Sequence, residues 1–277
     1  MGFRINTNIS SVKAQTSLSK VSRETQESSA KLSSGERITK AADDAAGLAI
    51  SEKLKANVRS SKQANRNAND GISLVQVAEG GLNETSSILT RMKELAVQAA
   101  SDTVGDSERE KASLEYEGMK SELERISAGT EFNGRKLLNG SGNTLDFHVG
   151  TGADSSDDHV SYSPQQINSG VNSLGVDRVS VLSKLGAQNS LNTLDSAISK
   201  VAGQRATLGS LQNRLVASSN NLMIYTENTS AANSRIRDLD YATETANQAR
   251  NTILQDANTT VLAQANMSGQ NVLKLIE

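Results

Sequence analysis

The sequence has no cysteine, no tryptophan and a single proline among its 277 residues, and only 3% of them are aromatic. Without cysteine, neither a disulfide nor a thiolate metal site can form. So few aromatic residues speak against a thick globular core, whereas helices that pack through Leu, Ile, Val and Ala remain feasible. These shortages favour a slender helical protein.

Excess charge and long apolar runs are also missing. The formal net charge is −2, so the basic stripe that phosphate binding requires is absent and no nucleic-acid partner is expected. No stretch of about 20 apolar residues occurs, so membrane insertion is not expected. The first residues lack the apolar segment of a secretory signal, so we expect any export to proceed without a cleaved signal peptide.

Both ends of the chain carry apolar or small residues at steps of three and four. This spacing places one narrow stripe on one side of a helix, as in the seam of a coiled coil. A narrow stripe buries little by itself, so each end needs a partner, either the other end or another copy of the chain. The predicted polymerisation seam comprises Ile5, Ile9, Val12, Leu254, Val261, Ala265, Val272 and Leu275.

Two longer seams lie between these ends. One runs from Leu54 to Ala99, past a Gly80-Gly81 pair, and the other from Leu191 to Leu239, continuing with little interruption into the C-terminal stripe. The spacing predicts a first helix over about 5–33. A shorter helix is expected to start at Ser107, where Glu110 completes a capping-box pattern.

The helical period is lost from about 129 to 188. Asn133-Gly134 and Asn139-Gly140 are tight-turn pairs. Leu145, Phe147 and Val149 alternate with polar residues, as do Val160 and Tyr162 across a Gly/Asp/Ser loop, and this pattern predicts a β-hairpin.

The predicted fold is mainly α, a long antiparallel helical bundle or coiled coil with a small β-hairpin region at about 140–188. Residues 1–43 and 236–277 are expected to form a terminal coiled-coil domain, and residues 44–235 the long-helix bundle. Because the two long helical stretches have matched lengths and run in opposite directions, the two termini are expected to lie together.

Chemistry-bearing clusters are scarce. His148 and His159 both fall in the hairpin region, and a metal site there could recruit only Asp154, Asp157 or Asp158. A solvated loop tip is the simpler interpretation. The acidic doublets Asp43-Asp44 and Asp238/Asp240 are best explained as helix-start charges. We therefore expect no catalytic, cofactor-binding or metal-binding residue, no cofactor and no enzyme activity. A metal-binding or hydrolytic protein that uses the histidine loop remains an alternative.

Several ordered motifs resemble those of one known family. Residues 30–38 (AKLSSGERI) and 42–50 (ADDAAGLAI) are similar to the N-terminal signature of bacterial flagellin, as are residues 94–99 and 132–134. Near the other end, residues 261–266 (VLAQAN) resemble its C-terminal region.

The resemblance implies a structural subunit that self-polymerises into the extracellular flagellar filament used for swimming. In that family the terminal helices pair as a coiled coil that lines an inner tube, and the subunits are exported through the flagellum's own channel. Only residues 140–188 are available for outer domains, so this is expected to be a short member without them. The family's partners are an export chaperone, a cap and hook-junction proteins. A hook–filament junction protein is the alternative within the flagellum.

The resemblance also implies host recognition. Arg91, Lys93, Glu94, Leu95 and Glu115 match the surface that a flagellin-sensing Toll-like receptor reads. Leu273, Leu275 and Ile276 match the terminal residues read by a cytosolic immune sensor. A solvated helix face and an inter-subunit seam, respectively, would account for the same residues.

Overall fold

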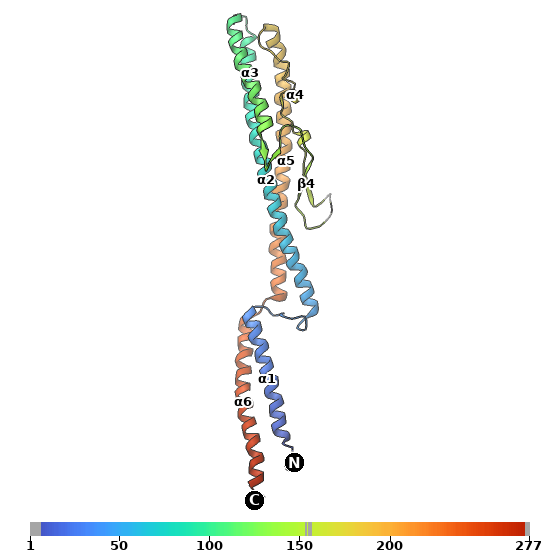
Figure 1. The fold of residues 1–277 in the computed structure, drawn as a ribbon, viewed down its shortest axis with the longest axis vertical. Coiled ribbons are helices and arrows are strands. Elements are labelled where there is room, and N and C mark those ends of the chain that lie inside the picture. Colours follow the sequence, from blue (N-terminus) through green and yellow to red (C-terminus); the bar gives the residue numbers. More distant parts are fainter. Residues whose placement is uncertain (1–6, 153, 155–156, 275–277) are drawn as a thin grey trace. The chain divides into compact units, whose positions relative to one another are not determined.

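The computed structural model describes residues 7–152, 154 and 157–274 (Figure 1). The chain forms two compact units: a terminal unit of residues 1–56 and 228–277, and a central unit of residues 57–227. The terminal unit therefore includes the start of helix α2 (Ala45–Ala99) and the end of helix α5 (Lys184–Arg237), which the sequence-based boundaries assign to the long-helix bundle.

In the terminal unit, helix α1 (Ile9–Ser34) lies antiparallel to helix α6 (Tyr241–Lys274) (Figure 1). The amide of Asn8 donates to the carbonyl oxygen of Ala265 at 2.8 Å, and Gln248 donates to the hydroxyl of Ser29 at 3.1 Å. Ala14, Val21 and Ser28 are the buried residues of α1, whereas no side chain described on α6 is fully buried. The two helices thus share a thin and largely polar interface.

The sequence predicted that the returning seam continues into the C-terminal stripe with little interruption, and the structure places this interruption at residues 238–240. Helix α5 ends at Arg237 and α6 begins at Tyr241. The chain breaks there because Asp240 accepts hydrogen bonds from the backbone N–H groups of Ala242 and Thr243, which caps a new helix. The N–H of Leu239 donates to the carbonyl oxygen of Gly35 at 3.0 Å, so the break is also tied to the end of α1.

In the central unit, α2 and α5 run antiparallel, and helix α3 (Asp106–Gly129) folds back beside them (Figure 1). Apolar residues at three-four spacing form one continuous core, as the seams predicted. Its largest fully buried side chains include Leu82, Leu89, Met92, Tyr116, Leu123, Leu194, Leu208 and Leu215.

Helix α3 starts one residue before the predicted capping pair. Gly105 is the N-cap, and its N–H donates to the carboxylate of Glu108 at 2.8 Å. The predicted pairing of Ser107 with Glu110 is therefore wrong. The helix begins earlier because the carbonyl oxygen of Gly105 already accepts from the N–H of Arg109.

The predicted hairpin is confirmed. Strands β3 (Leu145–His148) and β4 (His159–Tyr162) pair antiparallel, with Phe147 opposite Val160 and His148 opposite His159. The Asn133-Gly134 turn joins strands β1 (Glu131–Phe132) and β2 (Arg135–Lys136), with φ of 50° and 75° at its two residues. A short 3-10 helix, η1 (Pro164–Gln166), and helix α4 (Val171–Leu174) follow the hairpin, and α5 resumes the helical period before residue 188.

Helix α2 continues through Gly80-Gly81 without interruption. A Cβ on Gly81 would lie 2.6 Å from Leu138 Cδ1 and 2.8 Å from Thr130 Oγ1, whereas one on Gly80 would meet open space. Gly81 therefore allows the segment after α3 to approach the helix closely. Across the described ranges, no helix is long and apolar enough to cross a membrane.

Candidate assembly surface

Most of the predicted seam residues whose side chains the structure describes are exposed in the single chain. Ile9 is 51% exposed, Val12 56%, Leu254 43% and Val261 55%. Ala265 is half-buried, and its carbonyl oxygen accepts the hydrogen bond from Asn8. The buried side chains of α1 are instead Ala14, Val21 and Ser28, none of which belongs to the predicted seam.

Some residues of the predicted seam and of the predicted terminal immune-sensor set lie outside the part of the chain that the structure describes. These are Ile5, Leu275 and Ile276; Val272 and Leu273 belong to the last turns of α6, where the described part does not extend to side chains.

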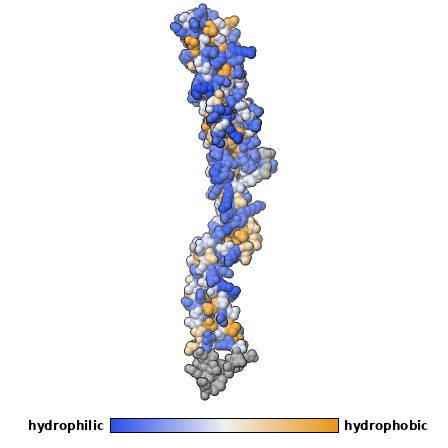
Figure 2. Space-filling view, viewed as in Figure 1, coloured by the Kyte–Doolittle hydropathy of each residue, from blue (hydrophilic) through white to orange (hydrophobic). Residues whose placement is uncertain are grey.

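The sequence analysis missed three other exposed apolar residues of α6. Ile253 is 69% exposed, Met267 56% and Tyr241 55%. Figure 2 shows hydrophobic residues reaching the surface in small groups among polar ones. A search for a stripe wider than one seam, starting from adjacent Ile253 and Leu254, would have found them. Burying one such side chain fully is worth about 1.5–3 kcal/mol, so together they offer substantial energy for association.

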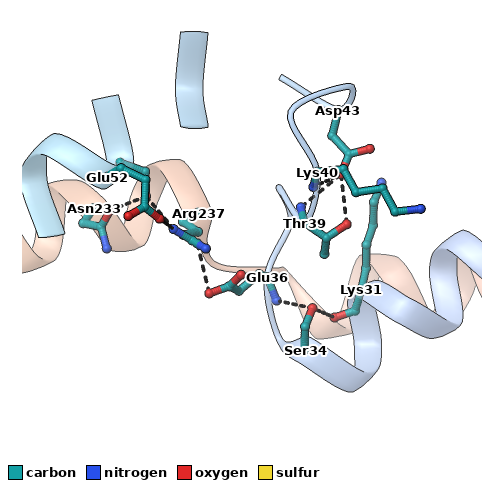
Figure 3. A network of polar contacts seen from close by, with 10 residues as sticks. Lys31, Ser34, Glu36, Thr39, Lys40, Asp43, Glu52, Asn233 and Arg237 are labelled. Carbon is teal, nitrogen blue, oxygen red and sulfur yellow. Dashed lines mark hydrogen bonds and ion pairs between the residues drawn. The ribbon is translucent and has the colours of Figure 1, made fainter. Parts of the chain in front are cut away.

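A polar network fixes the loop between α1 and α2 (Figure 3). The guanidinium of Arg237 ion-pairs with Glu36 at 2.9 Å and with Glu52, and its side chain is only 15% exposed. Hydrogen bonds from Arg237 to Glu52 and then Glu36 raise the pKa of Arg237. Beside it, the hydroxyl of Ser51 donates to Asn233 at 2.7 Å.

Backbone hydrogen bonds reinforce this network. The N–H of Arg37 donates to the carbonyl oxygen of Arg237 at 2.7 Å. In the same loop, the N–H groups of Lys40 and Thr39 donate to the carboxylate of Asp43 and lower its pKa (Figure 3). The last turn of α5 and the loop after α1 are therefore held as one piece within the terminal unit.

The charged residues of the predicted receptor surface reach the solvent, whereas its one apolar residue is buried. Arg91 ion-pairs with Glu115 at 2.9 Å and with Glu94 at 3.0 Å, and Glu94 and then Glu115 raise the pKa of Arg91. Lys93 pairs with Asp195 of α5. Leu95, by contrast, is 2% exposed and belongs to the core. The four charged residues form an exposed set on α2 and α3, and Leu95 supports it from beneath.

One member of each acidic doublet serves a helix start, as expected, whereas Asp43 binds the loop before α2 and Asp238 follows the end of α5. Asp44 accepts from the N–H of Gly47 at 2.8 Å at the beginning of α2, and Asp240 caps α6. The loop-tip interpretation of the histidines is wrong, because β3 and β4 bring His148 and His159 opposite one another within the ladder. Within the ranges given above, no group of three or more His, Asp or Glu side chains could hold a metal ion.

The fold and this surface define a class: a protein of long antiparallel helices whose terminal pair exposes an apolar stripe. Comparison with known families then identifies the group. The family model described as bacterial flagellin N-terminal helical region matches residues 5–143, and that of the C-terminal helical region matches residues 191–276. The chain belongs to the bacterial flagellin family.

Individual relatives agree over nearly their whole length. The chain is 38% identical to a flagellin of Bacillus subtilis (strain 168), covering 99% of this chain and 100% of that protein. It is also 38% identical to the flagellar filament 30.7 kDa core protein of Treponema maltophilum, covering 98% and 99%. A crystal structure of Bacillus cereus flagellin aligns with a TM-score of 0.51 at 30% identity, over 57% of this chain and 88% of that one. A short flagellin without large outer domains fits these lengths.

Proposed function

We propose that this chain is the structural subunit of a bacterial flagellar filament, which it builds by polymerising with copies of itself. The observation that supports this function is the exposed apolar stripe of the terminal helices, which no other described part of the chain covers. Relatives named as filament core proteins favour the filament over a hook–filament junction. The role is structural rather than catalytic, and the filament lies outside the cell.

The terminal domain, residues 1–43 and 236–277, lines the inner tube in this proposal. Residues 44–235 form the surrounding shell, with the 141–188 segment facing outward. The polarity of the surfaces supports this arrangement. The terminal helices expose Ile9, Val12, Leu254 and Val261, whereas most residues of the hairpin loop are exposed and polar.

The decisive variant is Val261→Asp. Val261 is 55% exposed in the single chain, so the monomer should fold normally. In the polymer the carboxylate would become buried without a partner, which is strongly unfavourable. We expect sedimentation to find no filaments from this variant, while circular dichroism finds the helix content of the unmodified chain.

Val261→Ala is the matched control, because it shortens the side chain without adding charge. It should still polymerise, at a higher critical concentration, since less apolar surface is buried per contact. Filaments of normal length from Val261→Asp would show that Val261 lies outside the contact. Long helical tubes from the purified chain alone would separate a filament subunit from a hook–filament junction protein.

Export belongs to the same proposal. We infer that the chain leaves the cell through the flagellar channel without a cleaved signal peptide, with an export chaperone, a cap and hook-junction proteins as partners. The thin α1–α6 interface supports this route, because a terminal unit with little buried surface unfolds at low cost.

Recognition by host receptors is a further part of the proposal. The exposed set Arg91, Lys93, Glu94 and Glu115 offers charged groups on adjacent turns and helices. Leu95 would act by positioning them, since it is buried. Leu273, Leu275 and Ile276 are proposed for the cytosolic sensor on the motif match alone.

A further inference from the structure

The two histidines of the chain form a cross-strand pair. In the antiparallel register His148 lies opposite His159, and the Nδ1 atom of His148 is 2.9 Å from the Nε2 atom of His159. The rings meet edge to face, with centroids 4.6 Å apart and planes at 78°. One ring nitrogen donates and the other accepts, so the accepting nitrogen presents its lone pair to the other ring.

The pair lies on the outward face of the hairpin. Side chains alternate along a strand, and Phe147, Val160 and Tyr162 occupy the face that contacts the core. His148 and His159 share the other face with Asp146 and Ser161, and both rings are half-buried. An ion in solution can therefore reach the imidazoles, while the strands hold them in place.

The backbone beneath the pair is held from several sides. The side chain of Asn67 on α2 donates to the carbonyl oxygen of His148 at 3.0 Å. Just beyond the ladder, the N–H of Val149 donates to the carbonyl oxygen of Asp158 at 2.8 Å. The two histidine Cα atoms are thus fixed relative to one another, and binding a ligand between the rings requires only side-chain rotation about soft torsions.

The distance between the nitrogens suits a metal chelate. Two imidazole nitrogens each about 2.0–2.1 Å from an ion lie about 2.9 Å apart when they bind at a right angle, and about 3.3 Å apart in a tetrahedron. The observed 2.9 Å is a hydrogen-bond distance, so the rings would turn about their side-chain torsions until both nitrogens face one ion, at the right angle of tetragonal Cu²⁺ or at the wider angle of a tetrahedron. Copper also binds nitrogen ligands more tightly than the other first-row divalent ions.

Neighbouring carboxylates add favourable charge without being required as ligands. Asp146 is the adjacent residue on the same face and accepts from the hydroxyl of Ser161 at 2.6 Å. The carboxylate of Asp158, next to His159, accepts from the N–H of Asp154 at 3.1 Å. Each carboxylate accepts a hydrogen bond from the polypeptide, and water would complete the coordination shell.

We propose that His148 and His159 form a two-nitrogen site for a divalent transition metal ion, with Cu²⁺ preferred. The ion takes the place of the proton between the two rings. The imidazole that loses this proton takes one up at its other ring nitrogen, so both rings stay neutral and each gives one lone pair to the ion. In a filament the site recurs once in every subunit, so the polymer carries a regular array of bound metal. This goes beyond the polymerisation function and does not depend on it, because the hairpin lies within the central unit of a single chain.

The test uses the full-length monomer and CuCl₂. Because the chain has only two histidines, calorimetry should find one site per chain whose affinity falls at least about tenfold in His148→Asn and in His159→Asn. Asp146→Asn, which keeps both rings and alters the neighbouring charge, is the matched control and should bind nearly as the unmodified chain does.

Electron paramagnetic resonance of the copper-loaded, unmodified chain gives a readout that needs no variant. Hyperfine splitting from two equivalent nitrogens is expected. Splitting from a single nitrogen, or binding that survives both histidine substitutions, would assign the copper to the N-terminal amine or to carboxylates and overturn the site. An unmodified chain that takes up no copper would also overturn it.

Discussion

At the scale of single residues, the two adjacent glycines of α2 have different reasons to be there. Gly81 admits Leu138 and Thr130 to the helix surface, whereas Gly80 is exposed and its missing side chain touches nothing. Glycine lowers helix stability in both positions by about 1 kcal/mol relative to alanine. Only at Gly81 is that cost offset by close packing.

Gly80→Ala should therefore stabilise the protein by about 0.4–1 kcal/mol, because it restricts the unfolded chain without creating a clash. Gly81→Ala should destabilise it by about 1–3 kcal/mol, since the added methyl group overpacks a site where Leu138 is fully buried. Urea denaturation followed by circular dichroism measures both. Equal effects of the two substitutions would show that Gly81 makes no close contact.

A second single-residue prediction concerns Asp240. The hydroxyl and N–H of Thr243 donate to its carboxylate and lower the pKa of Asp240, with help from the N–H of Ala242. A lowered pKa contributes stability above the ordinary aspartate range, and this contribution is lost as the pH falls through the lowered value. The first turn of α6 should therefore fray under acid conditions.

An asparagine at position 240 distinguishes the effect of the carboxylate charge from the effect of helix capping, because asparagine caps helices about as well as aspartate but does not titrate. In Asp240→Asn the first turn should stay protected but lose its dependence on pH, whereas Asp240→Ala should fray at every pH. Hydrogen exchange at Ala242 and Thr243, corrected for intrinsic rates, distinguishes the three proteins. Acid-sensitive fraying that persists in Asp240→Asn would point to another group.

At the scale of elements, regular hydrophobic spacing was sufficient to predict the long helices and the hairpin. The seam from Leu54 to Ala99 matches the buried face of α2, and the alternation at Leu145 and Phe147 gives the strand β3. The start of α2 at Ala45 was missed because its first turns expose most of their side chains and so carry no stripe.

Features that depend on contacts between distant segments escaped the sequence. One such feature is the set of hydrogen bonds that ties the break between α5 and α6 to the loop after α1, for example between Arg37 and Ile236, which are 199 positions apart. The histidine pair, by contrast, was predictable from the sequence. Pairing Leu145 with Tyr162 and Phe147 with Val160 across the hairpin sets the strand register, and this register places His148 opposite His159.

The α1–α6 pair should be the least stable element pair in the monomer. Its buried residues Ala14, Val21 and Ser28 are small, whereas the core of the central unit contains fully buried leucines. Local opening costs less free energy where less apolar surface is buried. We predict that residues 7–40 and 240–274 exchange their amide hydrogens rapidly in dilute monomer and become protected in the polymer.

Hydrogen exchange with mass spectrometry on both forms tests this directly. Amides of α2 between Leu82 and Met92 serve as the internal reference, because Leu82, Leu89 and Met92 in this stretch are 0% exposed in the single chain. Comparable protection of α1 and this reference in the monomer would contradict the prediction.

At the scale of the whole molecule, assembly should depend on the helices and not on the hairpin loop. Deleting residues 152–158 should leave polymerisation intact, since exposed loop tips tolerate shortening. Residues 149–151 would then connect His148 with His159 across the unchanged register. If this deletion stopped polymerisation while the monomer stayed folded, the loop would be an inter-subunit contact and the outward assignment of 141–188 would be wrong.

The terminal unit is assembled from the first and last parts of the sequence, and this has a consequence for timing. When the chain is delivered N-terminus first, every residue of the central unit is present before α6, so α1 can pair with α6 only after the rest of the chain has been delivered. A chain that stops early therefore never obtains a paired terminal unit. The arrangement acts as a test of completeness: only finished copies can present the surface through which the polymer grows.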